Sequence, residues 1–433
     1  MMHFSTIINK NIYIGISIKK KPQTYPYKRT HTSKRKIMNK KILTDLIDST
    51  FPPGIEVAIG YGSGVFEQKG YDNNNNDNNV NNINENDQMN KTMAISQFEE
   101  PPMIDMIFVV NDELEWHSNN LKWNSSHYAA LPRLLGPSFV SNVQRASAKI
   151  YYNTLVPMPE KYQQNVVNSN NKTNGKQLMK YGVINKSDFI NDLLNWETLY
   201  LSGRLQKPVA FLKKPEVIDS STIMSSNINI GHNTTNNNEH EINHALETNL
   251  CSALSTAILL LPSEFSELDL YKRITSLSYE GDFRMGIAEN PNKIDNIVNK
   301  GDSFQRFRNL YELYVDDLID QNVLTMKTQN NNSEDGGHIY MKHTNEFIRN
   351  DDGNDNYTSQ MLISKLPRSY QHDIKSTNVN NGLLLQHAKH ICKDKLQNTV
   401  RQFSRTQTLK GVLTAGISKG IIYSIQKILK RLK

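Results

Sequence analysis

Asparagine-rich tracts divide this chain into blocks and limit where a folded core can form. They lie at residues 73–90, 165–174, 227–243, 330–332 and 350–356. Because they lack apolar periodicity, they cannot bury enough surface to offset the entropy of ordering them. We interpret them as solvated insertions, with inert loop expansion favoured over a function of their own. The blocks between them provide ample sequence for two or three domains.

Cysteine and histidine usage argues against a disulfide or zinc framework. The chain has two cysteines, Cys251 and Cys392. Two isolated cysteines are consistent with a reducing compartment. His117 and His127 are ten residues apart and match no metal-ligand spacing.

Positive charge is concentrated at the N-terminus. Residues 1–44 contain eleven lysines and arginines, and the first acidic residue is Asp45. A basic, acid-free, hydroxyl-bearing terminus is typical of mitochondrial presequences, so we assign residues 1–42 as a presequence-like segment. A nonspecific basic tail is the alternative. No later segment has the apolar length of a transmembrane helix.

A short apolar strand ends in a Gly-Ser-Gly turn. Residues 56–60 run into Tyr61 and then Gly62, Ser63 and Gly64. The glycines expose backbone N–H groups and Ser63 adds a hydroxyl, so an anion can approach closely. The turn alone is a weak indication, because an ordinary glycine turn has the same sequence.

A second apolar strand, residues 103–110, carries Asp105. Asp105 shares one face of this strand with Ile107 and Val109. A buried aspartate is costly unless it is paired or bound to metal, which favours a functional Asp105 over an exposed edge residue. The strand, turn and second strand with an aspartate resemble nucleotidyltransferases of the polymerase-beta type. That pattern has a second acid at the position of Ile107, and the nearest substitute here is Asp112.

The chain from residue 43 to residue 213 mixes strand-like and helix-like segments, with asparagine-rich insertions near 72–100 and 163–175. This mixture predicts an α+β or α/β domain. Ser187 is expected to cap a helix that Gly203 ends. Residues 214–246 form an asparagine-rich linker or insertion.

Residues 247–405 are expected to form a mainly helical second domain with disordered insertions. Apolar residues from Leu250 to Leu261 follow a helical period that Pro262 stops. Ser266 is expected to cap the next helix.

Residues 406–433 are expected to form one amphipathic helix. Its apolar stripe would bind membrane, with lysines such as Lys419 and Lys430 away from the stripe. A helix packed on the protein's own core is the alternative. The stripe consists of Ile417, Ile421, Ile425, Ile428 and Leu432.

A collinear series of motifs resembles the mitochondrial phosphatidate cytidylyltransferase family, the translocator assembly and maintenance proteins. The series includes the turn Tyr-Gly-Ser-Gly-Val-Phe at 61–66 and Asp105 in its strand. Asn111 departs from the family, which often has aspartate there, whereas the absence of a second acid at Ile107 is typical of it. The other matching segments are 51–52, 116–121, 124–128, 180–184, 192–196, 199–208, 278–285 and 410–416.

The resemblance implies a nucleotidyltransferase-type mixed sheet with helices, a winged-helix-like second domain and a C-terminal membrane-binding helix. It implies that CTP and phosphatidic acid give CDP-diacylglycerol and pyrophosphate, with Mg²⁺ as cofactor, for cardiolipin synthesis. The expected location is peripheral, on the anionic matrix-side surface of the inner mitochondrial membrane. No nucleic-acid partner is expected, and the sequence leaves open whether the chain forms a homo-oligomer.

Several polar residues in the matched motifs are candidates for the reaction. We expect Gly62, Ser63, Gly64 and Arg204 to bind the nucleotide, Asp105, Lys180 and Lys207 to act in catalysis, and Asp105 and Asp112 to hold the metal. Each of the three basic residues has a surface ion pair as its alternative.

Other polar and aromatic residues leave structural and functional roles open. His117 and His127 could assist substrate binding or make structural hydrogen bonds. Asn119 and Asn124 could contact a base or cap a turn, and Asp282 and Arg284 could face a cleft or pair with each other. The tryptophans Trp116, Trp123 and Trp196 are expected in the core.

Two other functions compete with lipid cytidylyl transfer. An RNA-directed nucleotidyltransferase would share the turn and Asp105, but it would need a broad basic surface with aromatic platforms, and basic residues here are concentrated at the termini. A non-enzymatic inner-membrane maintenance protein is the second alternative, and Ile107 in place of an acid is its best support.

Overall fold

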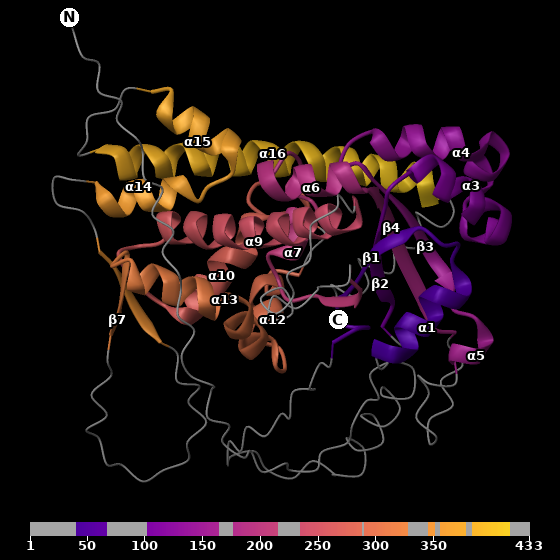
Figure 1. The fold of residues 1–433 in the computed structure, drawn as a ribbon, viewed down its shortest axis with the longest axis horizontal. Coiled ribbons are helices and arrows are strands. Elements are labelled where there is room, and N and C mark those ends of the chain that lie inside the picture. The colour runs from indigo at the N-terminus through magenta and orange to yellow at the C-terminus, as the bar shows by residue number, and fades with distance from the viewer. Residues whose placement is uncertain are drawn as a thin grey trace, which may run out of the picture. The chain divides into compact units, whose positions relative to one another are not determined.

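The computed structural model describes residues 40–66, 102–163, 176–214, 234–287, 290–327, 345–350, 356–377 and 383–415 (Figure 1). The predicted presequence-like segment and the stripe from Ile417 to Leu432 lie outside these ranges. The asparagine-rich tracts at 73–90, 165–174 and 330–332 also lie outside them.

A five-stranded mixed sheet organises the first half of the described chain. Its strand order is β3-β4-β2-β1-β5, with β2 parallel to β4 and the other neighbours antiparallel. This sheet and the many helices confirm the α+β prediction. The strands are β1 (Ile55–Tyr61), β2 (Ile104–Val110), β3 (Ile150–Pro157), β4 (Leu178–Asn185) and β5 (Ala210–Lys213).

The two faces of the sheet bury different sets of apolar side chains, as the alternation along 103–110 predicted. Met106 and Phe108 pack on the face that includes α1 and Trp116 of α3. Ile107 and Val109 pack on the opposite face with residues of α6, α7 and the start of α9. Each fully buried side chain of this size contributes about 1.5–3 kcal/mol. The helices of this half are α1 (Lys40–Thr50), α3 (Glu113–Trp123), η1 (Ser125–His127), α4 (Ala130–Arg145), α5 (Glu160–Gln163), α6 (Lys186–Asn195) and α7 (Ser202–Leu205).

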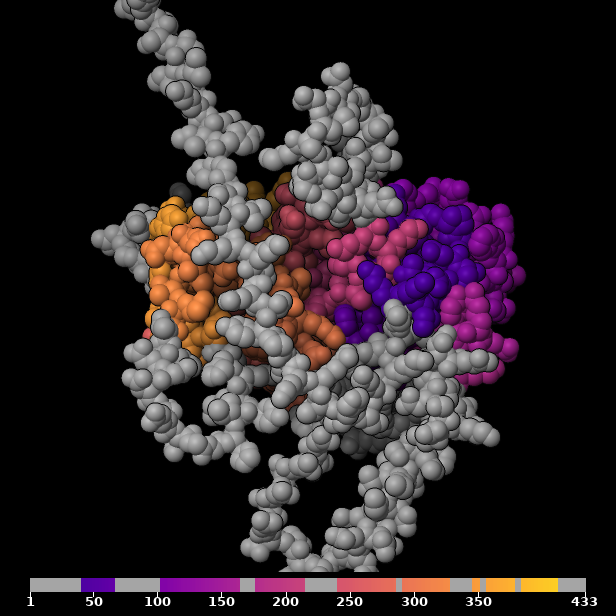
Figure 2. All heavy atoms as spheres, turned by 60° about the horizontal axis from the view of Figure 1, so that its bottom comes forward, coloured from indigo at the N-terminus to yellow at the C-terminus, as the bar shows by residue number. Residues whose placement is uncertain are grey.

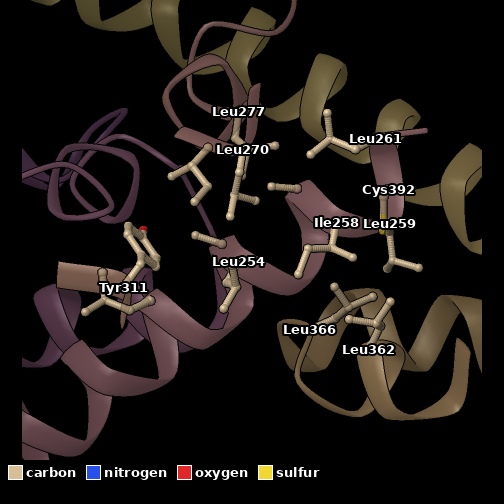
Figure 3. Close-up of a cluster of buried hydrophobic side chains, with 14 of the residues drawn as sticks. Leu254, Ile258, Leu259, Leu261, Leu270, Leu277, Tyr311, Leu362, Leu366 and Cys392 are labelled. Atoms are coloured by element: carbon tan, nitrogen blue, oxygen red, sulfur yellow. The ribbon is translucent and has the colours of Figure 1, made fainter. Parts of the chain in front are cut away.

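Helices dominate the second half, as predicted. They surround a separate apolar core to which α9, α10, α13 and α16 all contribute (Figure 3). The helices are α9 (Thr234–Leu260), α10 (Glu267–Leu277), α11 (Arg284–Ile287), α12 (Lys293–Asn299), α13 (Ser303–Asp320), α14 (Tyr357–Ser364), α15 (Arg368–Lys375) and α16 (Leu384–Ala415).

A small antiparallel sheet accompanies these helices. Its strand order is β6-β8-β7. The strands are β6 (Glu264–Ser266), β7 (Leu324–Lys327) and β8 (Glu346–Arg349).

Two helix starts were predicted from local capping residues, and one of them is correct. Ser266 caps α10 in a capping box with Asp269, as predicted. The prediction for α6 was wrong at both ends: Asn185 is the N-cap, and the helix ends at Asn195 rather than at Gly203. Trp196 adopts a left-handed conformation there, which turns the chain away from the helix axis.

Residues 234–243 of the asparagine-rich tract at 227–243 are helical, which corrects our interpretation of the tract as a solvated insertion. Helix α9 begins at Thr234 and continues through the tract. Ile242 is buried with Ala245 against the large sheet. Burial of these apolar side chains in tertiary contacts overrides the local composition.

The start of the predicted C-terminal amphipathic helix is part of α16. This helix runs without interruption through residue 406 to Ala415. Lys410 is buried and donates hydrogen bonds to the carbonyls of Gln144 and Ala146, so this part of α16 packs near the end of α4 (Figure 1). None of the helices in the described ranges combines the length and hydropathy needed to cross a bilayer.

His117 lies in a buried hydrogen-bond network between α3, α4 and the sheet. Its ring nitrogens contact Tyr128 Oη and Gln144 Oε1, both at 2.8 Å. Burial lowers the pKa of His117 to about 4, so the ring stays neutral in the folded protein at pH 7. This network gives His117 the structural role rather than a substrate contact.

Lowering the pH should therefore reduce the free energy of unfolding of the wild-type protein, because His117 binds a proton more readily in the unfolded chain. Between pH 6.5 and pH 4 the unfolded chain binds the proton before the folded chain does, so about 3 kcal/mol of the free energy of unfolding is lost. Urea unfolding from pH 7 to pH 4 should show a shallower pH dependence for His117→Gln. His240 is exposed, so His240→Gln is the control and should keep the wild-type dependence. Equal slopes for wild type and His117→Gln would contradict the assignment.

Candidate functional site

The Gly-Ser-Gly turn closes tightly against the start of β2. Gly62 has a φ of 78°, and its carbonyl accepts hydrogen bonds from the N–H groups of Val65 and Phe66 at 3.2 and 3.1 Å. A Cβ on Gly64 would lie 2.4 Å from the carbonyl oxygen of Met103. Glycine is therefore required at 64, and the close approach leaves Ser63 exposed at the edge of the sheet.

Strand register brings Asp105 and Lys180 together beside this turn. Asp105 pairs with Tyr61 on one side and with Lys180 on the other. Lys180 Nζ lies 3.7 Å from Asp105 Oδ1. A Cβ on Gly62 would be 3.3 Å from Asp105 Oδ2, so the carboxylate lies directly against the turn. The Asp105 and Lys180 side chains are 26% and 17% exposed, so a ligand can reach both.

Two tyrosines hold the basic side chains at this edge. Lys180 Nζ lies 4.3 Å from the centroid of the Tyr152 ring, and Arg204 Cζ lies 4.4 Å from that of Tyr61. Burial raises the pKa of Tyr61 to about 12, so its ring is neutral at physiological pH. A Cβ on Gly182 would lie 2.6 Å from Tyr152, so glycine there leaves room for that ring. These cation–π contacts fix the two positive charges near Asp105.

The short helix α7 carries Arg204 and is positioned by a buried carboxylate. Asp192 accepts six hydrogen bonds from the following loop. Their donors are the N–H groups of Thr198, Leu199, Leu201 and Ser202 and the hydroxyls of Thr198 and Ser202. This set of bonds fixes the loop that leads into α7.

Lys207 follows α7 and joins the two halves of the protein. Its Nζ donates to the Gly203 carbonyl and, at 2.7 Å, to Ser278 Oγ. Both Lys207 Nζ and Lys293 Nζ lie over the Tyr279 ring, at 5.1 and 4.5 Å from its centroid.

Electrostatics at α7 favour a bound anion. Burial lowers the pKa of Lys207 well below its ordinary value, and the nearby charges of Arg204 and Lys293 lower it further. Burial also disfavours the charged Arg204 guanidinium, but Tyr279, Tyr61, Tyr152 and Asp105 raise its pKa above the ordinary value. A ligand with several negative charges would act in the opposite direction and favour the protonated form of Lys207.

The structure does not bring Asp112 to Asp105. Asp105 is the second residue of β2, and Asp112 lies two residues beyond its end at Val110; the strand between Asp105 and Val110 alone spans about 16 Å at 3.3 Å per residue. The Asp112 carboxylate instead caps α3 by accepting from the N–H of Glu115 at 2.9 Å. One metal ion cannot contact both carboxylates, so Asp112 is not the second ligand to a metal on Asp105. No cluster of three or more His, Cys, Asp or Glu in the described ranges could hold a metal ion.

The remaining polar candidates mostly have structural partners. Asp282 and Arg284 pair with each other at 2.7 Å. Asn124 Nδ2 donates to the Thr50 carbonyl at 2.8 Å, and His127 Nδ1 lies 3.0 Å from Tyr181 Oη.

One tryptophan prediction was wrong. Trp116 and Trp196 are buried, as expected, but Trp123 is 60% exposed because it is the last residue of α3.

Sequence reasoning missed the aromatic and loop residues that arrange the charged ones. Tyr152 pairs with Gly182, two residues after Lys180, and this register between β3 and β4 is set by the tertiary structure. Asp192 lies in a matched motif, but nothing local indicates that it binds the following loop. Tyr279 and Lys293 come from the second half, so only the tertiary structure brings them to α7.

Comparison with known proteins identifies the family. A family profile described as "Phosphatidate cytidylyltransferase, mitochondrial" matches residues 43–430. Three relatives carry the same name. The Dictyostelium discoideum protein is 37% identical over 88% of this chain and 83% of its own length. The Mus musculus protein is 33% identical, with coverages of 88% and 92%, and the Schizosaccharomyces pombe protein is 33% identical, with coverages of 91% and 84%.

The chain belongs to the mitochondrial phosphatidate cytidylyltransferase family, which is a family of nucleotidyltransferases. The resemblance seen in the sequence is thereby confirmed. The same finding favours an enzyme over the non-enzymatic alternative and lipid chemistry over RNA chemistry.

Replacing Gly64 should damage the turn, because the new Cβ would collide with backbone at Met103. Gly64→Ala should lower the free energy of unfolding by about 1–3 kcal/mol in urea denaturation. Gly411→Ala is the matched control, because its Cβ would meet no atom within 4 Å. That variant should be neutral or up to about 1 kcal/mol more stable, because alanine favours the helix. Unchanged stability of Gly64→Ala would show that the turn can move away.

Proposed function

We propose that this protein transfers the cytidylyl group of CTP to phosphatidic acid, giving CDP-diacylglycerol and pyrophosphate. The observation that carries the proposal is the convergence of the Gly62–Ser63 turn, Asp105, Lys180 and Arg204 at one edge of the sheet. The relatives' name supports both substrates. The choice of cytosine over other bases rests on that name.

The arrangement suits a reaction that needs positioning and charge neutralisation more than proton transfer. A phosphate oxygen of phosphatidic acid attacks the α-phosphorus of CTP, and the bond from the α-phosphorus to the bridging oxygen breaks. Pyrophosphate leaves with the electron pair. Because the nucleophile is already an anion, no strong general base is required. The Gly62–Ser63–Gly64 turn would hold the β- and γ-phosphates, and Lys180, Arg204 and Lys207 would offset the charge.

The residues present fit a magnesium-dependent nucleotide site. Mg²⁺ is usually held by one or two carboxylates together with substrate phosphates and water, so Asp105 and the triphosphate would together suffice. When bound there, Mg²⁺ would neutralise charge on the phosphates as the leaving group departs. Asp105 lies against the turn, where those phosphates would bind.

Two finer structural assignments form part of the proposal. The mixed sheet with the Gly-Ser turn supports a nucleotidyltransferase-type first domain. The small sheet of β6, β8 and β7 among helices supports a winged-helix-like second domain.

We also propose a mitochondrial location, peripheral on the matrix side of the inner membrane, with the product used for cardiolipin synthesis. The relatives' name and the basic residues of 1–42 support the compartment. The lipid substrate and the stripe within 417–432 support membrane contact.

Asp105 should be essential for turnover, whereas Asp112 should not be. Purified protein would receive labelled CTP, Mg²⁺ and either phosphatidic acid vesicles or RNA. Wild type should form CDP-diacylglycerol only with the lipid. Asp105→Asn should lower kcat at least ~100-fold, because it removes the charge that offsets the metal. Asp112→Asn makes the same chemical change at the other end of β2 and should keep wild-type kcat.

Other results of this assay would overturn parts of the proposal. Full activity of Asp105→Asn would contradict the assignment of Asp105 to the active site. RNA extension, or no product from wild type with either acceptor, would overturn the lipid activity.

The apolar stripe near the C-terminus should govern membrane binding. Ile425→Asp places a charge on the stripe, and Gln426→Asp places the same charge on the opposite face of the predicted helix. Co-sedimentation with vesicles containing anionic lipid should fall about tenfold for Ile425→Asp and much less for Gln426→Asp. Equal sedimentation of both variants would favour a helix packed on the protein itself.

A further inference from the structure

A cavity of about 420 Å³ lies next to the candidate site. Phe66, four residues after Gly62, lines it from the first half, and Arg306 of α13 lines it from the second half. These two side chains are in contact, with Arg306 Cζ 4.4 Å from the centroid of the Phe66 ring. Figure 2 shows indigo residues of 40–66 adjoining orange residues of the second half. The cavity is within the size range of small-molecule sites, about 300–1,000 Å³.

The walls of this cavity are mainly apolar. They come from α7, β5 and the segment between them, and from α9 and α13. Water in such a cavity gains few hydrogen bonds, so an apolar ligand that displaces it would be favoured. The aliphatic and aromatic lining includes Leu205, Val209, Phe211, Leu246, Leu250 and Leu310.

Positive charge borders the apolar walls. Lys207, Lys214 and Arg306 all line the cavity, together with one carboxylate, Glu247. Lys214 Nζ lies 4.8 Å from the centroid of Phe211. An apolar cavity with an excess of cations at its border matches an amphiphilic molecule that carries an anionic phosphate group.

Lys207 connects the cavity to the catalytic edge. It lines the cavity, and it lies three residues after Arg204, whose guanidinium stacks on Tyr61 opposite Asp105. A lipid with its phosphate at Lys207 would have its apolar part along the cavity walls, one helical turn along the chain from Arg204. Attack on the α-phosphorus requires the lipid phosphate and the nucleotide to be neighbours, and this placement would meet that requirement.

We propose that this cavity binds the glycerol and the proximal acyl chains of phosphatidic acid, with Lys207 contacting the lipid phosphate. The proposal rests on the proposed cytidylyltransferase function and adds the place of the lipid substrate. The competing occupant is the cytosine base. Arg306 covers one face of the Phe66 ring, and Lys214 covers one face of the Phe211 ring. A base would need these ring faces for stacking, so the lipid is favoured as the occupant.

The test fills the cavity from a position where little core packing is lost. Asn243 of α9 lines the cavity and is half-buried, and the next residue, His244, is exposed and outside the lining. Asn243→Trp should occupy part of the cavity, whereas His244→Trp adds the same side chain to the surface. Equal melting temperatures of both variants and wild type would show that each has folded.

Binding of the soluble dihexanoyl phosphatidic acid would be measured by calorimetry without CTP, so that neither turnover nor vesicle binding contributes. Asn243→Trp should raise the Kd about tenfold, the effect expected when space for about two methylene groups is lost. His244→Trp should keep the wild-type Kd. In turnover assays, Asn243→Trp should raise the KM for phosphatidic acid and leave the KM for CTP within about twofold.

The results separate the two proposals. An unchanged Kd for dihexanoyl phosphatidic acid in a folded Asn243→Trp would overturn the lipid cavity. If Asn243→Trp raises the KM for CTP but not that for phosphatidic acid, the cavity belongs to the cytosine base, and the lipid proposal is likewise overturned. Wild type that binds the lipid but forms no CDP-diacylglycerol would count against the proposed function alone. If Asn243→Trp fails to fold, Asn309→Trp fills the cavity from an exposed position on α13 and should give the same increase in Kd.

Discussion

The buried carboxylate of Asp192 holds together the part of the molecule on which the site depends. A buried carboxylate costs several kcal/mol unless its lone pairs are satisfied, and six hydrogen bonds from residues 198–202 satisfy them here. Those bonds fix the loop between α6 and α7 despite the left-handed backbone at Trp196 and Leu199. Because α7 begins where the loop ends, the directions of Arg204 and Lys207 follow from one side chain.

A second set of polar contacts ties this loop to the helical half. Asn249 of α9 accepts from Trp196 Nε1 at 2.8 Å and donates to the Ser202 carbonyl at 3.0 Å. Tyr311 of α13 donates to the Gln206 carbonyl at 2.8 Å. The basic side chains around α7 are thus held in place before a ligand arrives. Burial and the charges of Arg204 and Lys293 favour the neutral form of Lys207 in the free protein, and a polyanionic ligand would favour its protonated form.

Local chemistry in the sequence predicted several features that the structure contains. Alternation along 103–110 assigned Ile107 to one face and Phe108 to the other, and Ser266 indicated the start of α10. The predictions that were wrong concern features that depend on distant parts of the chain. The parallel pairing of β2 with β4 decides that Asp105 meets Lys180 and leaves Asp112 at the far end. Likewise, packing of Ile242 on the sheet orders a segment whose composition predicts a loop.

The close approach of Gly64 to Met103 bears on how long the connection between β1 and β2 can be. It brings together the two ends of the connection between β1 and β2, which contains the asparagine-rich tract at 73–90. Once the ends are joined, doubling the length of such a connection costs only about 0.6 kcal/mol of closure entropy. Insertions can therefore accumulate beside the Gly62–Ser63–Gly64 turn without moving Ser63 or Asp105. Close packing of one glycine thus separates the length of this connection from the positions of Ser63 and Asp105.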